Sequence, residues 1–213
     1  MNQQKSSKST TRRVAITGMM IAVTILMSFT PVGMIPTPLG TATVSHLPTI
    51  ILAILEGPIC GLISGAVMGL ISMWRAIAMP QSLLDPLFRN PLISVLPRML
   101  IGLTSYYVYT GIGTLLKNKK AKNAVSVVAG AAVGSITNTV GVLGMLYLIE
   151  LKGVFDAIVQ MGLATQSDES VGAVIAFVVA VATTVGVAEM AVVAAIAAVV
   201  ILALKRAGYG RKF

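Results

Sequence analysis

Long apolar runs alternate along the chain with short stretches that are polar or rich in proline. The apolar runs are continuous and lack the alternating polarity of a barrel strand, so they predict helices. A membrane span needs roughly 17 to 25 residues, and the second and third runs are short by that measure. The predicted helices cover Val14–Thr30, Thr41–Glu56, Pro58–Trp74, Pro91–Leu116, Ala124–Tyr147 and Ser170–Leu204.

The composition places these helices in a lipid bilayer. The chain has 213 residues, of which 56% are hydrophobic and 11% charged, and its mean hydropathy is +0.89. So few polar groups cannot cover the surface of a soluble fold of this size. We therefore predict an all-α integral membrane protein with six transmembrane helices.

The basic residues predict the orientation. Of the 16 Lys and Arg residues, 12 lie in three groups that alternating crossings put on one side. The positive-inside rule makes that side cytoplasmic. We predict cytoplasmic tails at residues 1–13 and 205–213, with a membrane domain at 14–204 between them and no nucleic-acid partner. The three groups are Lys5, Lys8, Arg12 and Arg13; Lys117, Lys119, Lys120 and Lys122; and Lys205, Arg206, Arg211 and Lys212.

Two connections stand out on the predicted outer side. Residues 31–40 contain three prolines and two glycines without a charge, which predicts a stiff apolar loop. Residues 150–169 are predicted as a polar segment. No small-residue cleavage pattern follows the first apolar run, so we expect it to be a retained helix rather than a signal peptide.

The sequence shows no catalytic set. It has one histidine, and its single cysteine, Cys60, lies in an apolar run, so neither a disulfide framework nor a cysteine metal site is expected. There is no phosphate-binding loop for ATP. Active transport would need a partner to supply the energy, and no cofactor is expected on this chain.

Three polar residues fall at membrane depth, where such groups mark functional sites or paired structural ones. Arg98 follows Pro97, which is expected to bend its helix, and its bidentate guanidinium suits a carboxylate. A structural pair with Glu189 or with helix carbonyls is the alternative. Asn138, among glycines, could contact an amide or hydroxyl or only allow close helix packing. For Glu189 we favour structural pairing.

Four residues near the predicted outer face are further candidates for substrate contact. His46 opens the second helix, Trp74 and Arg75 end the third, and Asn90 precedes the fourth. A hydrogen-bonded structural role for His46 and an interfacial anchor for Trp74 and Arg75 are the alternatives. On the first helix, Gly18 and Ala22 form a small-x-x-x-small pair with Ala15 nearby, which permits close approach of another helix.

Five short strings carry a resemblance to a known family. They are Phe29-Thr-Pro-Val-Gly33, Ala42-Thr-Val-Ser-His-Leu-Pro48, Leu55-Glu-Gly-Pro58, Val95-Leu-Pro-Arg-Met-Leu-Ile-Gly102 and Gly134-Ser-Ile-Thr-Asn-Thr139. They resemble the substrate-binding S component of an energy-coupling factor (ECF) vitamin importer, of the subfamily that takes pantothenate, pyridoxine-type vitamins or cobalamin. The resemblance covers about residues 12 to 206.

The resemblance implies a pocket near the outer face, closed by the loop between the first two helices. It also implies partners: a transmembrane coupling subunit and two ATPase subunits, which alone use ATP. The family's first helix docks on the coupling subunit through an Ala-x-x-x-Ala pair, whose positions Gly18 and Ala22 occupy here. The expected localisation is a bacterial plasma membrane.

Among the family's vitamins, pantothenate is the predicted substrate, and a pyridoxine-type vitamin or cobalamin is the alternative. Arg98 could hold its carboxylate, and Asn138 its amide or a hydroxyl. The few aromatic residues, 5% of the chain, argue against a flat ring substrate. Two other classes stay open from the residues alone: a secondary transporter with Glu189 and Asp85 as proton sites, and a membrane scaffold without a ligand.

Overall fold

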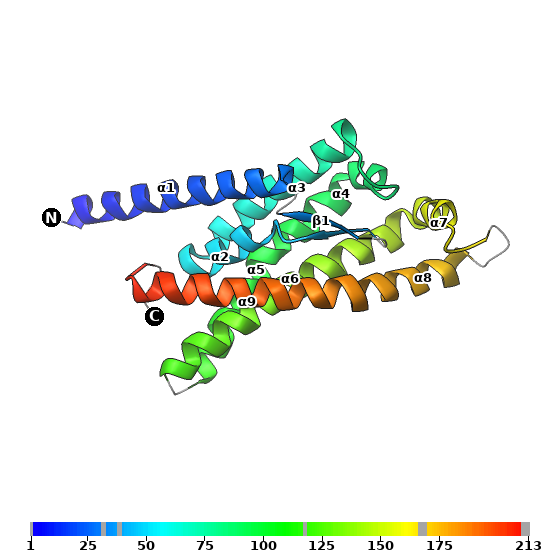
Figure 1. The fold of residues 1–213 in the computed structure, drawn as a ribbon. Coiled ribbons are helices and arrows are strands. Elements are labelled where there is room, and N and C mark those ends of the chain that lie inside the picture. Colours follow the sequence, from blue (N-terminus) through cyan, green and yellow to red (C-terminus); the bar gives the residue numbers. More distant parts are fainter. Residues whose placement is uncertain (1, 31–32, 38–39, 117–118, 166–169, 210–213) are drawn as a thin grey trace.

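The computed structural model describes residues 2–30, 33–37, 40–116, 119–165 and 170–209. It is a bundle of helices with one small β-hairpin (Figure 1). The elements in chain order are α1 (Asn2–Phe29), β1 (Met34–Thr37), β2 (Gly40–Thr43), α2 (Leu47–Glu56), α3 (Pro58–Ala78), the 3₁₀ helix η1 (Asp85–Arg89), α4 (Pro91–Ser94), α5 (Leu96–Leu115), α6 (Lys119–Ile149), α7 (Leu151–Gln160), α8 (Ser170–Val181), the π-helical turn η2 (Ala182–Gly186) and α9 (Val187–Arg206).

The structure has the predicted class, a helical membrane protein. In the part of the chain that the structure describes, five helices are long and apolar enough to cross a membrane. They are Thr10–Phe29, Pro58–Ala78, Pro91–Leu115, Asn123–Ile149 and Val171–Arg206. The predicted second span is represented by α2, which has ten residues. Such a helix is about 15 Å long, half of the roughly 30 Å hydrocarbon core.

Helix α2 lies in the middle of the bundle. All ten of its residues are buried, and they pack among α3, α5, α6 and α9. A sharp turn at Gly57, with φ of 109°, connects it to Pro58 at the start of α3. Because protein surrounds α2 on all sides, it need not be long enough to meet both lipid interfaces.

The segment between α1 and α2 differs from the predicted loop. Residues 34–37 and 40–43 form an antiparallel hairpin in which Met34 pairs with Thr43 and Thr37 with Gly40. The prediction that a helix begins at Thr41 is therefore wrong, because residues 40–43 are a strand and α2 starts at Leu47. Backbone N–H and C=O groups at membrane depth need hydrogen-bond partners, and pairing of β1 with β2 supplies partners for the groups on their shared edge.

Irregular turns interrupt two of the long helices. The predicted fourth helix is broken at Val95 into α4 and α5, next to Pro97, as the missing proline N–H requires. The last helix contains the π turn η2, a feature that is often found at functional sites. The polar segment 150–169 contains a short helix, α7, whose buried side packs Val154, Phe155 and Ile158 against the end of the bundle.

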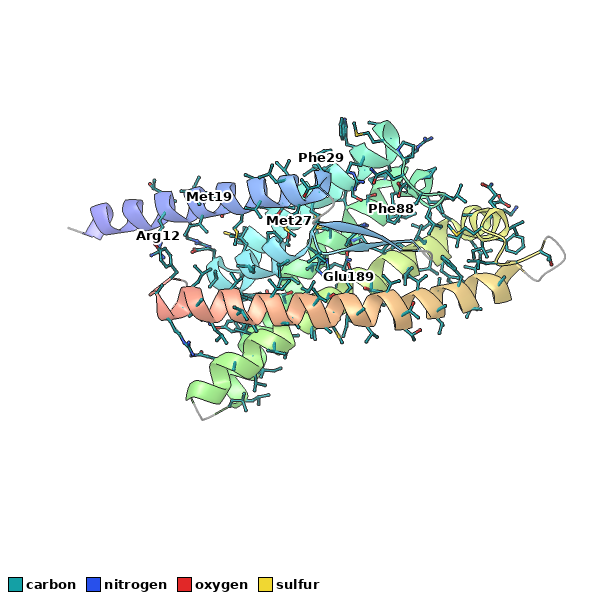
Figure 2. The ribbon with its side chains drawn as sticks, in the orientation of Figure 1. Arg12, Met19, Met27, Phe29, Phe88 and Glu189 are labelled. Atoms are coloured by element: carbon teal, nitrogen blue, oxygen red, sulfur yellow. The ribbon has the colours of Figure 1, made fainter. Side chains whose placement is uncertain are left out.

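Helix α1 lies on the outside of the bundle. Only 11% of its span is buried; Met27 packs against the core, whereas Met19 is exposed (Figure 2). The start of α1 and the end of α9 lie at the same end of the bundle, opposite α7 (Figure 1). At that end the guanidinium of Arg12 lies 5.1 Å from the ring centre of Tyr209.

Helices α3 and α5 approach each other closely through two glycines, Gly61 and Gly102. A Cβ atom added to Gly102 would lie 2.4 Å from the carbonyl carbon of Gly61, which no real contact allows. The glycines therefore let the two backbones touch, as small residues do in membrane bundles.

This crossing can be tested within one helix. Gly102→Ala should lower the melting temperature of the purified protein, because overpacking typically costs about 1–3 kcal/mol. Gly111→Ala is the matched control, since a Cβ at Gly111 meets nothing within 4 Å. The control should melt at or slightly above the wild-type temperature. Equal melting of the two variants would contradict the close crossing.

Candidate functional site

A cavity of about 140 Å³ lies in the half of the bundle that is farthest from the termini. Its walls come from α3, η1, α5, α6, α8, η2 and α9, together with Thr43 at the end of β2. One part of the lining is apolar: Leu84, Phe88, Val142, Leu143, Leu146, Phe177, Val181 and Val185. The other is polar or charged: Thr43, Ser72, Arg75, Gln81, Ser82, Asp85, Arg98, Asn138, Thr139 and Glu189.

Arg98 is placed in the cavity by the break between α4 and α5. The carbonyl of Ile93 would accept a helical hydrogen bond from residue 97, but Pro97 has no N–H. Arg98 Nη1 donates to that carbonyl instead, at 2.7 Å. The guanidinium also lies over the ring of Phe88, with Cζ 5.2 Å from its centre.

Most of the hydrogen-bonding capacity of Arg98 is not used by the described residues. Its side chain is buried, at 6% exposed, and Nε has no hydrogen-bond partner among the described residues. Of the two structural alternatives, an ion pair between Arg98 and Glu189 is not present within 4.0 Å in the described part of the chain. A hydrogen bond to a helix carbonyl, that of Ile93, is present. A buried guanidinium with unused donors suits an anionic group.

Asn138 lines the cavity from α6, next to Thr139. It is 5% exposed, and its Oδ1 has no partner among the described residues. Across from it, Gly186 of η2 packs against α6: an added Cβ would lie 2.8 Å from Cγ2 of Thr139. Asn138 therefore presents an unpaired acceptor at the place where the π turn approaches α6.

Arg75 and Asp85 shape the wall between α3 and η1. Asp85 accepts hydrogen bonds from the backbone N–H groups of Gln81 and Ser82, at 2.6 and 3.0 Å, and from the Ser82 hydroxyl. Arg75 donates to Gln81 Oε1 at 2.9 Å. These contacts hold residues 81–85 against α3. The Asp85 carboxylate therefore has a structural role, as the acceptor of three hydrogen bonds within this segment.

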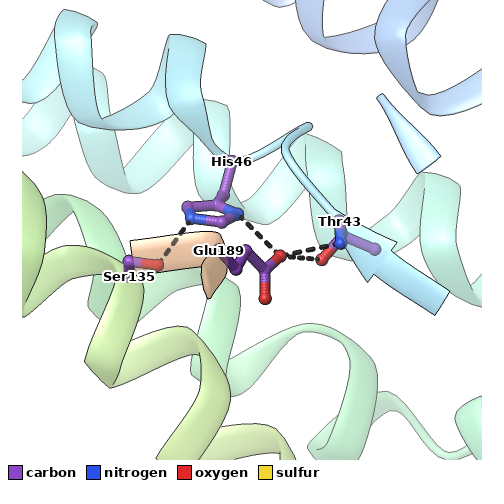
Figure 3. A network of polar contacts seen from close by, with 4 residues as sticks. All are labelled: Thr43, His46, Ser135 and Glu189. Carbon is purple, nitrogen blue, oxygen red and sulfur yellow. Dashed lines mark hydrogen bonds and ion pairs between the residues drawn. The ribbon is translucent and has the colours of Figure 1, made fainter. Parts of the chain in front are cut away.

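Glu189 lies at the centre of a polar network that crosses the bundle (Figure 3). Its Oε1 accepts hydrogen bonds from the backbone N–H and the hydroxyl of Thr43, at 2.7 and 2.9 Å. His46 Nδ1 is 3.9 Å from the same oxygen, and His46 Nε2 is 3.2 Å from Ser135 Oγ. His46 is fully buried behind Glu189 and is not part of the cavity lining.

Two other predicted contacts lie outside the cavity. Trp74 is 51% exposed and packs edge-on against Phe29, with ring centres 5.6 Å apart, as an interfacial anchor would. The Asn90 side chain caps α4 by accepting from the N–H of Leu92 at 3.0 Å. The structure thus brings Arg75, Arg98 and Asn138 together but not Trp74, Asn90 or His46.

The small residues of α1 are on its outer surface. Ala15, Gly18 and Ala22 are exposed, and an added Cβ at Gly18 meets nothing within 4 Å. They therefore do not serve packing inside the bundle, which was the alternative to docking.

Several cavity residues were not predicted from the sequence. Thr43 was assigned to the start of a helix, and Phe88 and Phe177 had no distinguishing signal. For Thr139 the signal was its place beside Asn138 in a polar cluster of an apolar helix, because such clusters usually face the bundle interior.

The chain matches the family model described as "ECF transporter, substrate-specific component" over residues 12–201. The chain belongs to this family. It is a multi-pass protein of the cell membrane, and its family is a substrate-binding component of a transporter rather than an enzyme.

This ECF substrate-specific component is similar to two curated bacterial proteins. It is 36% identical over 104 residues to the "Pantothenate transporter PanT" of Leuconostoc mesenteroides subsp. mesenteroides, and the aligned residues cover 46% of this chain and 50% of that protein. It is 32% identical over 157 residues to the "Pantothenic acid transporter PanT" of Lactococcus lactis subsp. cremoris, and the aligned residues cover 66% of this chain and 75% of that protein. The chain thus matches half the length of the first relative.

Proposed function

We propose that this protein captures pantothenate from outside the cell, as the substrate-binding subunit of an ECF-type importer that uses ATP on its partner subunits. The observation that supports this substrate is the buried Arg98, which lines a cavity of mixed apolar and polar residues and whose Nε has no partner among the described residues. Pantothenate is a small anion with one carboxylate, one amide and two hydroxyls. The names of both relatives support the same substrate.

The carboxylate, one donor group and the hydrocarbon part of the ligand have matching residues in the cavity. Arg98 would bind the carboxylate, and the unpaired Oδ1 of Asn138 would accept from the amide N–H or a hydroxyl. The apolar residues of α6 and α8 would contact the hydrocarbon part of the ligand. Arg75 is a second cation in the lining, while Trp74, His46 and Asn90 would act through neighbours, since none of them lines the cavity.

We also propose six crossings with both termini in the cytoplasm. Five long helices alone would leave the termini on opposite sides, yet α1 begins and α9 ends at the same end of the bundle (Figure 1). Helix α2 and the hairpin before it together make the remaining crossing. The basic clusters near both termini favour the cytoplasm for that end.

Helix α1 would dock on the coupling subunit of the importer, which also carries two ATPase subunits. Its exposed face carries Ala15, Gly18 and Ala22 among exposed apolar side chains, including Val14, Met19 and Leu26. Small residues there would let a partner helix approach closely.

The substrate assignment is tested at Arg98. Arg98→Ala should weaken pantothenate binding at least tenfold, because a charge-assisted hydrogen bond is worth about 1.5–3 kcal/mol. Arg98→Lys should recover part of the affinity. The neutral alcohol analogue should bind the wild type poorly and be nearly insensitive to Arg98→Ala. Binding is measured by calorimetry. The melting temperature of each variant without ligand shows how much stability is lost with the Arg98–Ile93 hydrogen bond, separately from any loss of affinity.

Arg13→Ala is the control for this experiment. Arg13 is a half-buried arginine whose Nη2 donates to the Glu56 carbonyl at 2.7 Å, far from the cavity lining. Its removal should leave pantothenate affinity unchanged. Unchanged affinity in a folded Arg98→Ala protein would rule out the carboxylate contact.

The orientation is tested by labelling introduced cysteines with an impermeant maleimide. Asp156→Cys, on the exposed side of α7, should react in intact cells. Asn123→Cys, exposed near the start of α6, should react only after permeabilisation. The wild type gives the background from buried Cys60. The reverse pattern would overturn the orientation.

The docking role is tested at Gly18. Gly18→Leu should abolish uptake by cells that hold the complete importer while pantothenate binding to the purified protein persists, because the bulky side chain blocks only the partner. Gly172→Leu is the matched control at the other end of the bundle: Gly172 also has no atom within 4 Å of an added Cβ. Loss of binding and uptake together in Gly18→Leu would show that α1 has a role in internal packing.

A further inference from the structure

The β1–β2 hairpin borders the cavity through Thr43. Two strands alone are at best marginally stable, so the hairpin needs anchors. One anchor is at its base, where Val44 N–H donates to the Gly33 carbonyl at 2.9 Å. Gly33 in turn packs on the end of α1: an added Cβ would lie 2.1 Å from the carbonyl oxygen of Met27.

The second anchor is on the side of the cavity. Neighbouring amides in a strand point to opposite edges, so the Thr43 N–H points away from the strand partner that Val44 uses. An unpaired edge donor in apolar surroundings is costly. Glu189 satisfies this donor at 2.7 Å and takes the Thr43 hydroxyl at 2.9 Å with the same oxygen (Figure 3).

The position of Glu189 is itself determined by the bundle. It lies in the first turn of α9, directly after the π turn, where Gly186 allows close contact with Thr139 of α6. His46, before α2, lies between Glu189 and Ser135 of α6. Three helices therefore hold the carboxylate that meets the hairpin.

We propose that Glu189 is a positioning residue that holds the β1–β2 hairpin at the wall of the cavity, through an acceptor oxygen rather than through its negative charge. Releasing this contact frees the end of the hairpin that borders the cavity, and bound ligand then leaves faster. The second consequence rests on the proposed function, because it assigns the cavity to pantothenate; the first does not.

The hairpin itself is tested on ligand-free protein by hydrogen–deuterium exchange of peptides that cover residues 40–46. Glu189→Ala should speed exchange in this segment about tenfold, because it removes both hydrogen bonds to Thr43, and a tenfold change corresponds to about 0.7 kcal/mol for each of them. Glu189→Gln should stay close to the wild type, because its amide oxygen can accept both bonds from Thr43. Fast exchange in both variants would overturn the acceptor role, and unchanged exchange in Glu189→Ala would overturn the anchor.

Glu56→Ala is the matched control. Glu56 is also a buried glutamate, 7% exposed, and its carboxylate pairs with Arg13 at 3.5 Å away from the cavity lining. Its removal should leave exchange at residues 40–46 unchanged. If Glu189→Ala fails to fold, Thr43→Val decides: it removes only the hydroxyl bond, so exchange should rise modestly, and an unchanged rate would overturn the proposal.

Pantothenate dissociation separates this inference from the proposed function. The dissociation rate should rise several-fold in Glu189→Ala, remain near the wild-type value in Glu189→Gln and be unaffected by Glu56→Ala. Normal dissociation from a Glu189→Ala protein with fast hairpin exchange would show that the hairpin does not retain the ligand. A wild type that binds no pantothenate would refute the substrate while leaving the exchange result to judge the anchor.

Discussion

Hydrogen-bonding groups inside a membrane bundle cannot bind bulk water, so each needs a partner in the protein or in its ligand. This constraint explains the irregular parts of the molecule. Pro97 leaves the Ile93 carbonyl without its helical donor, and Arg98 supplies one. The hairpin leaves the Thr43 N–H at an outer edge, and Glu189 accepts it. Each substitute bond brings a charged side chain to the cavity.

The same constraint separates structural charges from those available to a ligand. Glu189 and Asp85 already accept two or more hydrogen bonds from the described residues. Among the described residues, Arg98 donates to one carbonyl and its Nε has no partner, and Oδ1 of Asn138 has none either. These groups could bind a carboxylate and an N–H or O–H group, as the proposed substrate would require.

Glycine has two opposite uses in this bundle. At Gly61, Gly102 and Gly186 an added Cβ would collide with a neighbouring helix, so these positions set how closely the cavity walls approach. At Gly18 the space is open, although the sequence spacing looks the same as in a packing motif. A small residue thus indicates close approach, while only the fold shows whether the neighbour is in the same chain or in a partner.

The sequence by itself determined the membrane class and the approximate positions of five long helices, and it singled out Arg98 and Asn138, which line the cavity. Length, hydropathy and a polar group at membrane depth are local properties. The sixth predicted span is only the ten-residue helix α2, because burial within the bundle removes the need to cross the bilayer alone. The sequence did not determine the hairpin, in which residues 34–37 pair with residues 40–43 and Thr43 contacts Glu189, a residue 146 positions away. Nor could it distinguish Arg75, which lines the cavity, from Trp74, which faces outward one position earlier. Those assignments depend on how helices rotate and cross, and that is decided by contacts between residues far apart in the chain.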